Sequence, residues 1–166
     1  MRPRDSWFQP MADVVSAVKR SAMMAGIRGK NTNPEMLLRA GLHRRGLRYR
    51  LHDRSLPGSP DMIFVQHRAV LFANGCFWHG HFCHLFKWPT TRPTFWKQKI
   101  EATRHRDTEA HAALRQEGWR VAIVWECALK GLAKLPLAKI LDKCETWVRS
   151  DALELEIIGI ETRPSL

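Results

Sequence analysis

The spacing of apolar residues indicates helices in the first third of the chain. Asn33 and Pro34 are typical of a helix start, because Asn is a good N-cap and Pro suits the first helical turn. Apolar side chains then recur on one face as far as Gly46, which ends this helix. A shorter helix is predicted over residues 12–24, followed by a polar link over residues 26–32.

Further along the chain, the period changes from helical to extended. Alternating or continuous apolar runs predict three short strands, over residues 47–51, 61–65 and 69–73. A basic helix over residues 94–117, a strand over 119–126 and a helix over 135–148 follow, and residues 153–160 form one more strand or an ordered tail. Helices that flank a mixed sheet make this an α/β protein.

Composition and charge narrow the class of protein. The 166 residues suffice for one domain with a real core, expected over residues 11–150, between a flexible extension over 1–10 and a C-terminal strand or tail over 151–166. Lysine and arginine number 27 against 16 acidic residues, and the net charge of +11 favours a polyanionic partner such as nucleic acid over an ordinary solvated surface. No apolar run approaches the roughly eighteen residues of a membrane span.

Metal-binding residue types are concentrated in residues 75–84, which include two cysteines and three histidines. Cys76, His81 and Cys83 can supply three ligands of a tetrahedral zinc site, in which thiolate and imidazole atoms lie about 2.0–2.3 Å from the ion. Cys127, at the end of the late strand, is the best candidate for the fourth ligand. The sequence therefore predicts a structural zinc that ties a central loop to that strand.

Two other fates of cysteine remain as alternatives. A free cysteine is often a small buried hydrophobic residue, and this interpretation suits Cys144, which lies inside an apolar helical pattern. Disulfides are disfavoured, because no hydrophobic signal segment precedes the first predicted helix and we expect a cytoplasmic location, where thiols stay reduced.

A Pro-Asp pair opens the strand that begins at Asp61. Metal-dependent nucleases of the PD-(D/E)XK type hold a carboxylate in such a place, where it binds Mg²⁺. An aspartate after proline is more often a turn former, and the usual acid-x-Lys of the next strand is missing, since residues 71–74 contain no carboxylate. A conventional member of that group is therefore disfavoured.

Several motifs together resemble the very-short-patch-repair (Vsr) endonucleases. The matching segments span about residues 11–147 and are Ser55–Asp61, Gly75–His79, Leu85–Lys87, Phe95–Trp96, Gly118–Val121 and Val124–Leu129. The resemblance implies a restriction-endonuclease-like core with a structural zinc. It also implies nicking of DNA 5′ to the thymine of a T:G mismatch that deamination of 5-methylcytosine has left.

The resemblance assigns catalytic roles by position. Asp61 matches the metal-binding aspartate, and the main-chain carbonyl of Ala73 matches the second Mg²⁺ ligand of the protein. His79 matches the histidine that activates the attacking water, a role that suits an imidazole near neutral pH. Glu35 and Asp107 match supporting acids, although from the residues alone Glu35 only favours the helix dipole and Asp107 is a solvated helix residue.

One departure from the family pattern concerns the pair before Gly75. The pair is Ala73-Asn74 here, where family members carry Thr-His. A carbonyl ligand needs no hydroxyl, so Ala73 can serve. Asn74 can hydrogen-bond a water but cannot act as an imidazole acid or base, which puts that secondary role in doubt.

DNA engagement also follows from the resemblance. Phe77, Trp78 and Trp96 match aromatic residues that wedge into the duplex beside the mismatch, and aromatic rings next to basic side chains are suited to stacking on bases. Met24 and Lys99 match positions that read the wobble pair from the two grooves. From the residues alone, core packing is the alternative for these aromatic residues and for Met24, and Lys99 is a solvated lysine.

The hypothesis from the sequence is a Mg²⁺-dependent, zinc-stabilised DNA mismatch endonuclease. We expect double-stranded DNA with a T:G mismatch as its substrate, mismatch-repair factors of the MutL type as possible partners, a monomer, and a bacterial cytoplasm with use at the nucleoid. A Vsr-like nuclease with another DNA target, or a zinc-bearing module that binds mismatched DNA with weak catalysis, are the alternatives. Nothing in the sequence separates the first hypothesis from the other nuclease.

Overall fold

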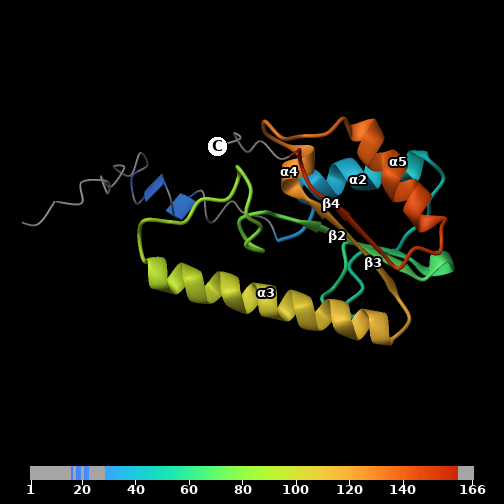
Figure 1. The fold of residues 1–166 in the computed structure, drawn as a ribbon, viewed down its shortest axis with the longest axis horizontal. Coiled ribbons are helices and arrows are strands. Elements are labelled where there is room, and N and C mark those ends of the chain that lie inside the picture. Colours follow the sequence, from blue (N-terminus) through green and yellow to red (C-terminus); the bar gives the residue numbers. More distant parts are fainter. Residues whose placement is uncertain (1–15, 17, 20, 23–28, 161–166) are drawn as a thin grey trace, which may run out of the picture. The chain divides into compact units, whose positions relative to one another are not determined.

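The computed structural model describes residues 16, 18–19, 21–22 and 29–160, which belong to two units, residues 1–32 and 33–166 (Figure 1). In the first unit, residues 18, 19, 21 and 22 are helical, in agreement with the helix predicted over residues 12–24. Met24 lies outside the described residues. The remaining elements all belong to the second unit.

A four-stranded mixed sheet forms the centre of the second unit, in the order β1-β2-β3-β4. Its strands are β1 (Met62–Phe64), β2 (Ala69–Asn74), β3 (Arg120–Trp125) and β4 (Glu154–Ile157). β1 and β2 are antiparallel and joined by the 3-10 helix η1 (Val65–His67), whereas β2, β3 and β4 are parallel. Asn74 pairs with Trp125 in the last register position of β2 and β3, so the carboxyl ends of both strands meet at one edge of the sheet.

Helices cover both faces of this sheet (Figure 1). They are α2 (Asn33–Arg44), α3 (Pro93–Gln116), the one-turn α4 (Glu126–Leu129) and α5 (Leu137–Val148). Leu38 of α2 and Ile140 of α5 pack with Leu71 and Val124 on one face. Leu114 of α3 packs on the other face, with residues such as Val70 and Val121. The alternation of side chains along β2 and β3 thus gives each face its own core.

The mixed α/β class predicted from the sequence is confirmed, with two local differences. Residues 47–51 are not a strand, because their only pairing is an isolated bridge between Arg50 and Ile63. Their alternation has another cause: Leu47 and Tyr49 pack into the core, and the Tyr49 hydroxyl donates to the Arg39 carbonyl at 2.8 Å. The second difference is α4, a single helical turn where the sequence predicted the end of a strand.

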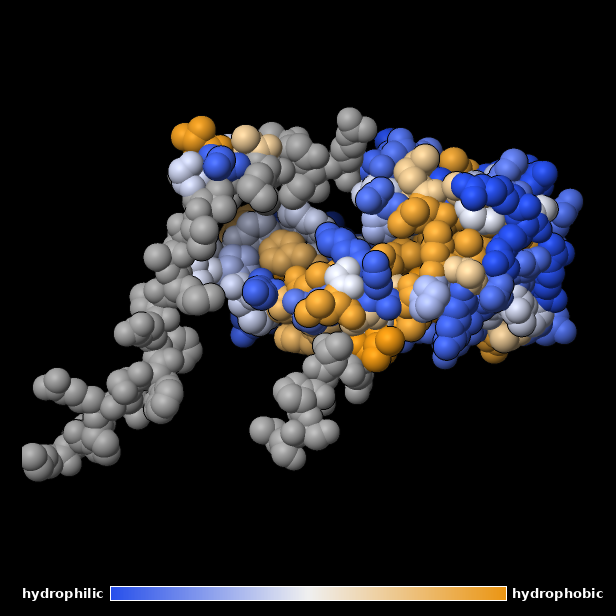
Figure 2. All heavy atoms as spheres, turned by 90° about the horizontal axis from the view of Figure 1, so that it is seen from above, coloured by the Kyte–Doolittle hydropathy of each residue, from blue (hydrophilic) through white to orange (hydrophobic). Residues whose placement is uncertain are grey.

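The surface of the second unit is not uniformly polar. Figure 2 shows apolar side chains reaching the surface between hydrophilic ones. The most exposed large apolar residues of this unit include Leu132 at 89%, Leu153 at 75% and Phe82 at 69%. Within the described part of the chain, no helix is long and apolar enough to cross a membrane.

Candidate active site and metal centre

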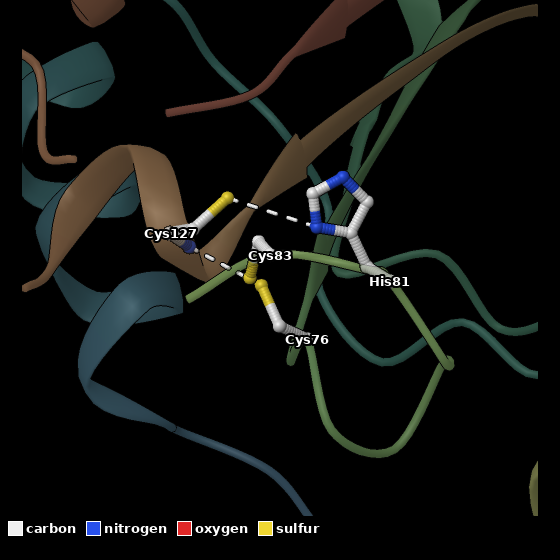
Figure 3. Close-up of side chains that lie close together, drawn as sticks. All are labelled: Cys76, His81, Cys83 and Cys127. Atoms are coloured by element: carbon white, nitrogen blue, oxygen red, sulfur yellow. Dashed lines mark hydrogen bonds between the residues drawn. The ribbon is translucent and has the colours of Figure 1, made fainter. Parts of the chain in front are cut away.

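Four potential metal ligands lie together at the edge where β2 and β3 end (Figure 3). They are the residues predicted from the sequence: Cys76, His81, Cys83 and Cys127. Their ligand atoms are all within 4.8 Å of one another, and Cys76 and Cys127 are buried. The parallel pairing of β2 and β3 explains this meeting, because Cys76 follows β2 by two residues and Cys127 follows β3 by two.

Backbone amides surround the sulfur atoms of this cluster. The Cys127 amide donates to Cys76 Sγ at 3.3 Å, the Gly159 amide to Cys127 Sγ at 3.3 Å, and the Leu85 amide to Cys83 Sγ at 3.4 Å. N–H donors aimed at sulfur favour the thiolate, the form that binds metal. Burial acts in the opposite direction and raises the pKa of the Cys76 and Cys127 thiols, so a cation is needed to hold these sulfurs ionised together.

The donor set and its geometry fit a zinc ion. A tetrahedron with Zn–S bonds of about 2.3 Å has edges of about 3.8 Å, and the Cys127 Sγ to His81 Nδ1 distance is 3.7 Å. Burial lowers the pKa of His81, which favours the neutral imidazole that a metal requires. Sulfur and imidazole ligands bind zinc in preference to magnesium or calcium, which favour oxygen ligands.

The C-terminal strand β4 and the residues after it support this cluster. The sequence did not predict this support. The Trp125 ring stacks on the His81 ring with centroids 4.3 Å apart and an interplanar angle of 16°. Trp125 Nε1 donates to Glu156 Oε1 at 2.6 Å, so β4 holds the indole in place. A Cβ atom at Gly159 would lie 2.6 Å from the Cys127 carbonyl oxygen, and this close approach requires glycine. Glu156, through Trp125, and Gly159, through its contact with Cys127, therefore help to position the residues of the Cys/His cluster.

A second group of polar residues surrounds Asp61. Asp61 Oδ2 accepts a hydrogen bond from the Ala73 amide at 2.7 Å, and the Asp61 amide donates to the Leu71 carbonyl at 3.1 Å. The amide and carbonyl of one strand residue point to the same side of the strand. The Ala73 carbonyl therefore faces the side on which Asp61 lies, and both can offer oxygen atoms to one cation.

Burial is the main reason that the pKa of Asp61 is raised, from 3.8 to about 6. The Ala73 amide opposes this effect, the charge of Glu35 adds to it, and the charges of Arg39 and His79 again oppose it. Glu35 and Arg39 form an ion pair at 2.7 Å, and both are at least nine-tenths buried. Glu35 is thus not a solvated residue of the helix start: α2 carries it inward to the surroundings of Asp61.

His79 and Asp107 are brought together from the loop after β2 and from α3. His79 Nδ1 lies 2.5 Å from Asp107 Oδ2, and both side chains are partly exposed. A carboxylate that accepts from Nδ1–H leaves Nε2 as the proton acceptor of the imidazole. The pair can therefore accept a proton from a water, which a solvated Asp107 without a partner could not support.

The neighbouring aromatic residues form a cluster instead of joining the main core. Phe77 contacts Trp78 and Trp96 at ring-centroid distances of 5.1 and 5.3 Å, and all three rings are partly exposed. Lys99 Nζ lies 5.8 Å from the ring centroids of both tryptophans and 5.7 Å from that of Phe95. Of the residues predicted to contact DNA, the structure thus brings four together.

Comparison with known proteins points to one family. Residues 12–85 match the family model described as DNA mismatch endonuclease Vsr. The chain is 49% identical over 134 residues to the type II nicking enzyme V.XorIIP of Xanthomonas oryzae pv. oryzae, covering 80% of this chain and 98% of the relative. It is 42% identical over 147 residues to the DNA mismatch endonuclease Vsr of Escherichia coli, covering 89% and 94%. It is also 39% identical over 123 residues to the type II nicking enzyme V.NmeAIP of Neisseria meningitidis, covering 74% and 88%.

Proposed function

The chain belongs to the Vsr family of DNA mismatch endonucleases, and we propose that it nicks double-stranded DNA 5′ to the thymine of a T:G mismatch. As a member of this family it is a phosphodiester hydrolase. The observation that carries the proposal is that Asp61 lies near enough to the His79–Asp107 pair for the charge of His79 to act on it, in a chain whose relatives are named as mismatch and nicking endonucleases. We also propose that the mixed sheet is the restriction-endonuclease-like core that the motifs implied.

Two different metals suit the two groups of ligands. Asp61 and the Ala73 carbonyl offer hard oxygen atoms, which suit Mg²⁺, and the soft Cys/His cluster suits a structural Zn²⁺. A bound Mg²⁺ supplies neutralisation of the charge that develops on the scissile phosphate and its leaving oxygen. The raised pKa of Asp61 agrees with a cation ligand, because a buried carboxylate surrounded by protein alone is costly to ionise.

The protein's own proton transfer falls to His79. Asp107 accepts from Nδ1–H, fixes the tautomer and stabilises the imidazolium that forms when Nε2 takes the proton of the attacking water. The charges of Glu35 and Arg39 act on Asp61 from α2. Their proposed role is to set the charge around the cation ligand.

The aromatic cluster and the charge of the chain account for DNA binding. A net charge of +11 supplies contacts to phosphates. We infer that Phe77, Trp78 and Trp96, whose rings contact one another and are partly exposed, insert beside the mismatch. A T:G wobble pair is easier to unstack than a matched pair, so part of the selectivity comes from the lower cost of insertion.

The direct test is nicking of duplexes that differ only in T:G against C:G at one position, in buffer with Mg²⁺. We expect one nick 5′ to the mismatched thymine, leaving 5′-phosphate and 3′-hydroxyl ends, and none in the C:G duplex. Asp61→Ala, purified in the same way, should bind both duplexes but not nick, which excludes a contaminating nuclease. Equal nicking of both duplexes would indicate a nuclease with another target, and binding without nicking would indicate a binding module.

A further inference from the structure

A second aromatic surface lies next to the proposed wedge and has no role in the function described so far. Phe86 is its centre: the ring centroid of Phe82 lies 5.2 Å away and that of Trp88 5.0 Å away, both in edge-on geometry. Phe82 is 69% exposed and Trp88 is 47% exposed. Phe86 also stacks on Phe77 at 6.1 Å with an interplanar angle of 29°, so this surface is continuous with the wedge cluster.

The backbone beneath these rings is firmly held. Cys83 lies between Phe82 and Phe86 and is one of the four clustered metal-ligand residues. The Phe86 amide donates to the Cys83 carbonyl at 3.0 Å, and Leu85 packs on the buried cluster of Cys76, Trp125 and Cys127. The chain therefore presents large apolar rings to solvent from a loop that is already ordered, which lowers the entropic cost of ordering the loop when a ligand binds.

The charge around this surface favours one kind of partner. From Met62 to Ile100 the sequence contains no aspartate or glutamate. Lys87 lies between Phe86 and Trp88 and is exposed, and the guanidinium of Arg92 lies 4.6 Å from the ring centroid of Phe95. Exposed aromatic rings among basic residues, with no acid nearby in the sequence, match a polyanion that also carries flat apolar groups.

We propose that Phe82, Phe86 and Trp88 form a second stacking surface, which takes unstacked nucleobases of one DNA strand beside the wedge. This inference rests on the proposed DNA substrate and extends it from a single mismatch to the nucleotides next to it. The occupant is a nucleic acid strand with accessible bases, because base–aromatic stacking needs ring faces and not a sequence-specific set of hydrogen bonds. Lys87 would contact a phosphate of the same strand.

The test is equilibrium binding of a labelled single-stranded oligonucleotide and of a T:G duplex, measured by fluorescence anisotropy at several salt concentrations. Trp88→Ala combined with Phe82→Ala should weaken single-strand binding by about tenfold and leave the salt slope unchanged, since no charge is removed. Lys87→Gln should instead lower the salt slope by about one. Trp88→Phe keeps an aromatic ring and should bind nearly as wild type.

Leu132→Ala is the matched control, because Leu132 is exposed but lies outside the aromatic surface. Zinc content, measured for each variant, shows whether the neighbouring Cys83 still binds. Equal single-strand affinity of the double variant and the control would overturn the proposal. The proposal would also be overturned if wild type were a dimer and the double variant a monomer, because the surface would then be a contact between two chains. Because these readouts need no nicking, they can succeed if the proposed mismatch cleavage fails.

Discussion

Asp61→Asn should make the magnesium-free protein more stable while it abolishes nicking. Burial raises the pKa of Asp61 from 3.8 to about 6. Each pKa unit corresponds to about 1.4 kcal/mol, so ionisation of Asp61 destabilises the folded chain by about 3 kcal/mol relative to the protonated carboxyl. Asparagine is neutral, and its amide oxygen can still accept the hydrogen bond that the Ala73 amide now donates at 2.7 Å.

The sign of the pH dependence follows from the direction of the shift. Between pH of about 4 and about 6 the folded protein keeps a proton on Asp61 that the unfolded chain has lost, so the free energy of unfolding falls as the pH rises. Below this window both states are protonated, and above it both are ionised. The difference between Asp61→Asn and wild type should therefore be near zero at the acidic end and grow to between about 1 and 3 kcal/mol above pH 6.

Urea denaturation at a series of pH values, in magnesium-free buffer, measures this difference. Asp53→Asn is the matched control: hydrogen bonds from Ser55 lower the pKa of Asp53, so its replacement should not stabilise the protein. Added Mg²⁺ should stabilise wild type and not Asp61→Asn. An Asp61→Asn protein that is no more stable than wild type at pH 7 would show that burial of this carboxylate is not costly, and the argument for a cation ligand would lose its physical basis.

Three further predictions test the other parts of the site. Cys127→Ser should lose zinc and several kcal/mol of stability, because the binding free energy of a structural zinc is folding free energy. Cys144→Ser, a change in the buried core on α5, should keep zinc and serves as the control. Equal zinc content of the two variants by elemental analysis would contradict the ligand assignment. Asp107→Asn should lower kcat for nicking at least about tenfold with little change in DNA affinity, because Asp107 acts through His79; a loss of binding in an anisotropy assay would refute this role. Asn74→His should keep or raise the nicking rate, and a large loss would mean that this active site is organised differently from the family pattern.

Most of the fold could be predicted from the periodicity of the sequence, because the strands and long helices each have a core-facing side of their own. The strand predicted over residues 47–51 was wrong, because a half-buried segment without strand pairing shows the same alternation of apolar and polar residues. Leu47 and Tyr49 face the core, but only Arg50 reaches a backbone partner, Ile63. The four clustered cysteine and histidine residues could be predicted because their residue types are distinctive and two of them follow neighbouring strands.

The pairing partners within the site could not be predicted in the same way. The contact between His79 and Asp107 joins residues 28 positions apart, and that between Trp125 and Glu156 joins residues 31 positions apart. Such contacts depend on where α3 packs on the sheet and on where β4 joins it, which no local pattern encodes. Asp107 was named only through the resemblance, and Glu156 was missed, because an acidic residue on an edge strand has no sequence signal that separates it from a solvated one.

Trp125 links the two groups of residues that make up the site. Its ring stacks on His81 of the Cys/His cluster at 4.3 Å and meets the His79 ring edge-on at 6.3 Å. Glu156 holds the indole at 2.6 Å, and Trp125 is 9% exposed, so the ring has little freedom to move. Because packed groups of this kind transmit displacements instead of absorbing them, a metal at His81 would fix Trp125, and Trp125 would limit the positions open to His79. Trp125 at the end of β3 thus contacts both a residue of the Cys/His cluster and the proposed proton acceptor, so loss of the metal should also disturb the position of His79.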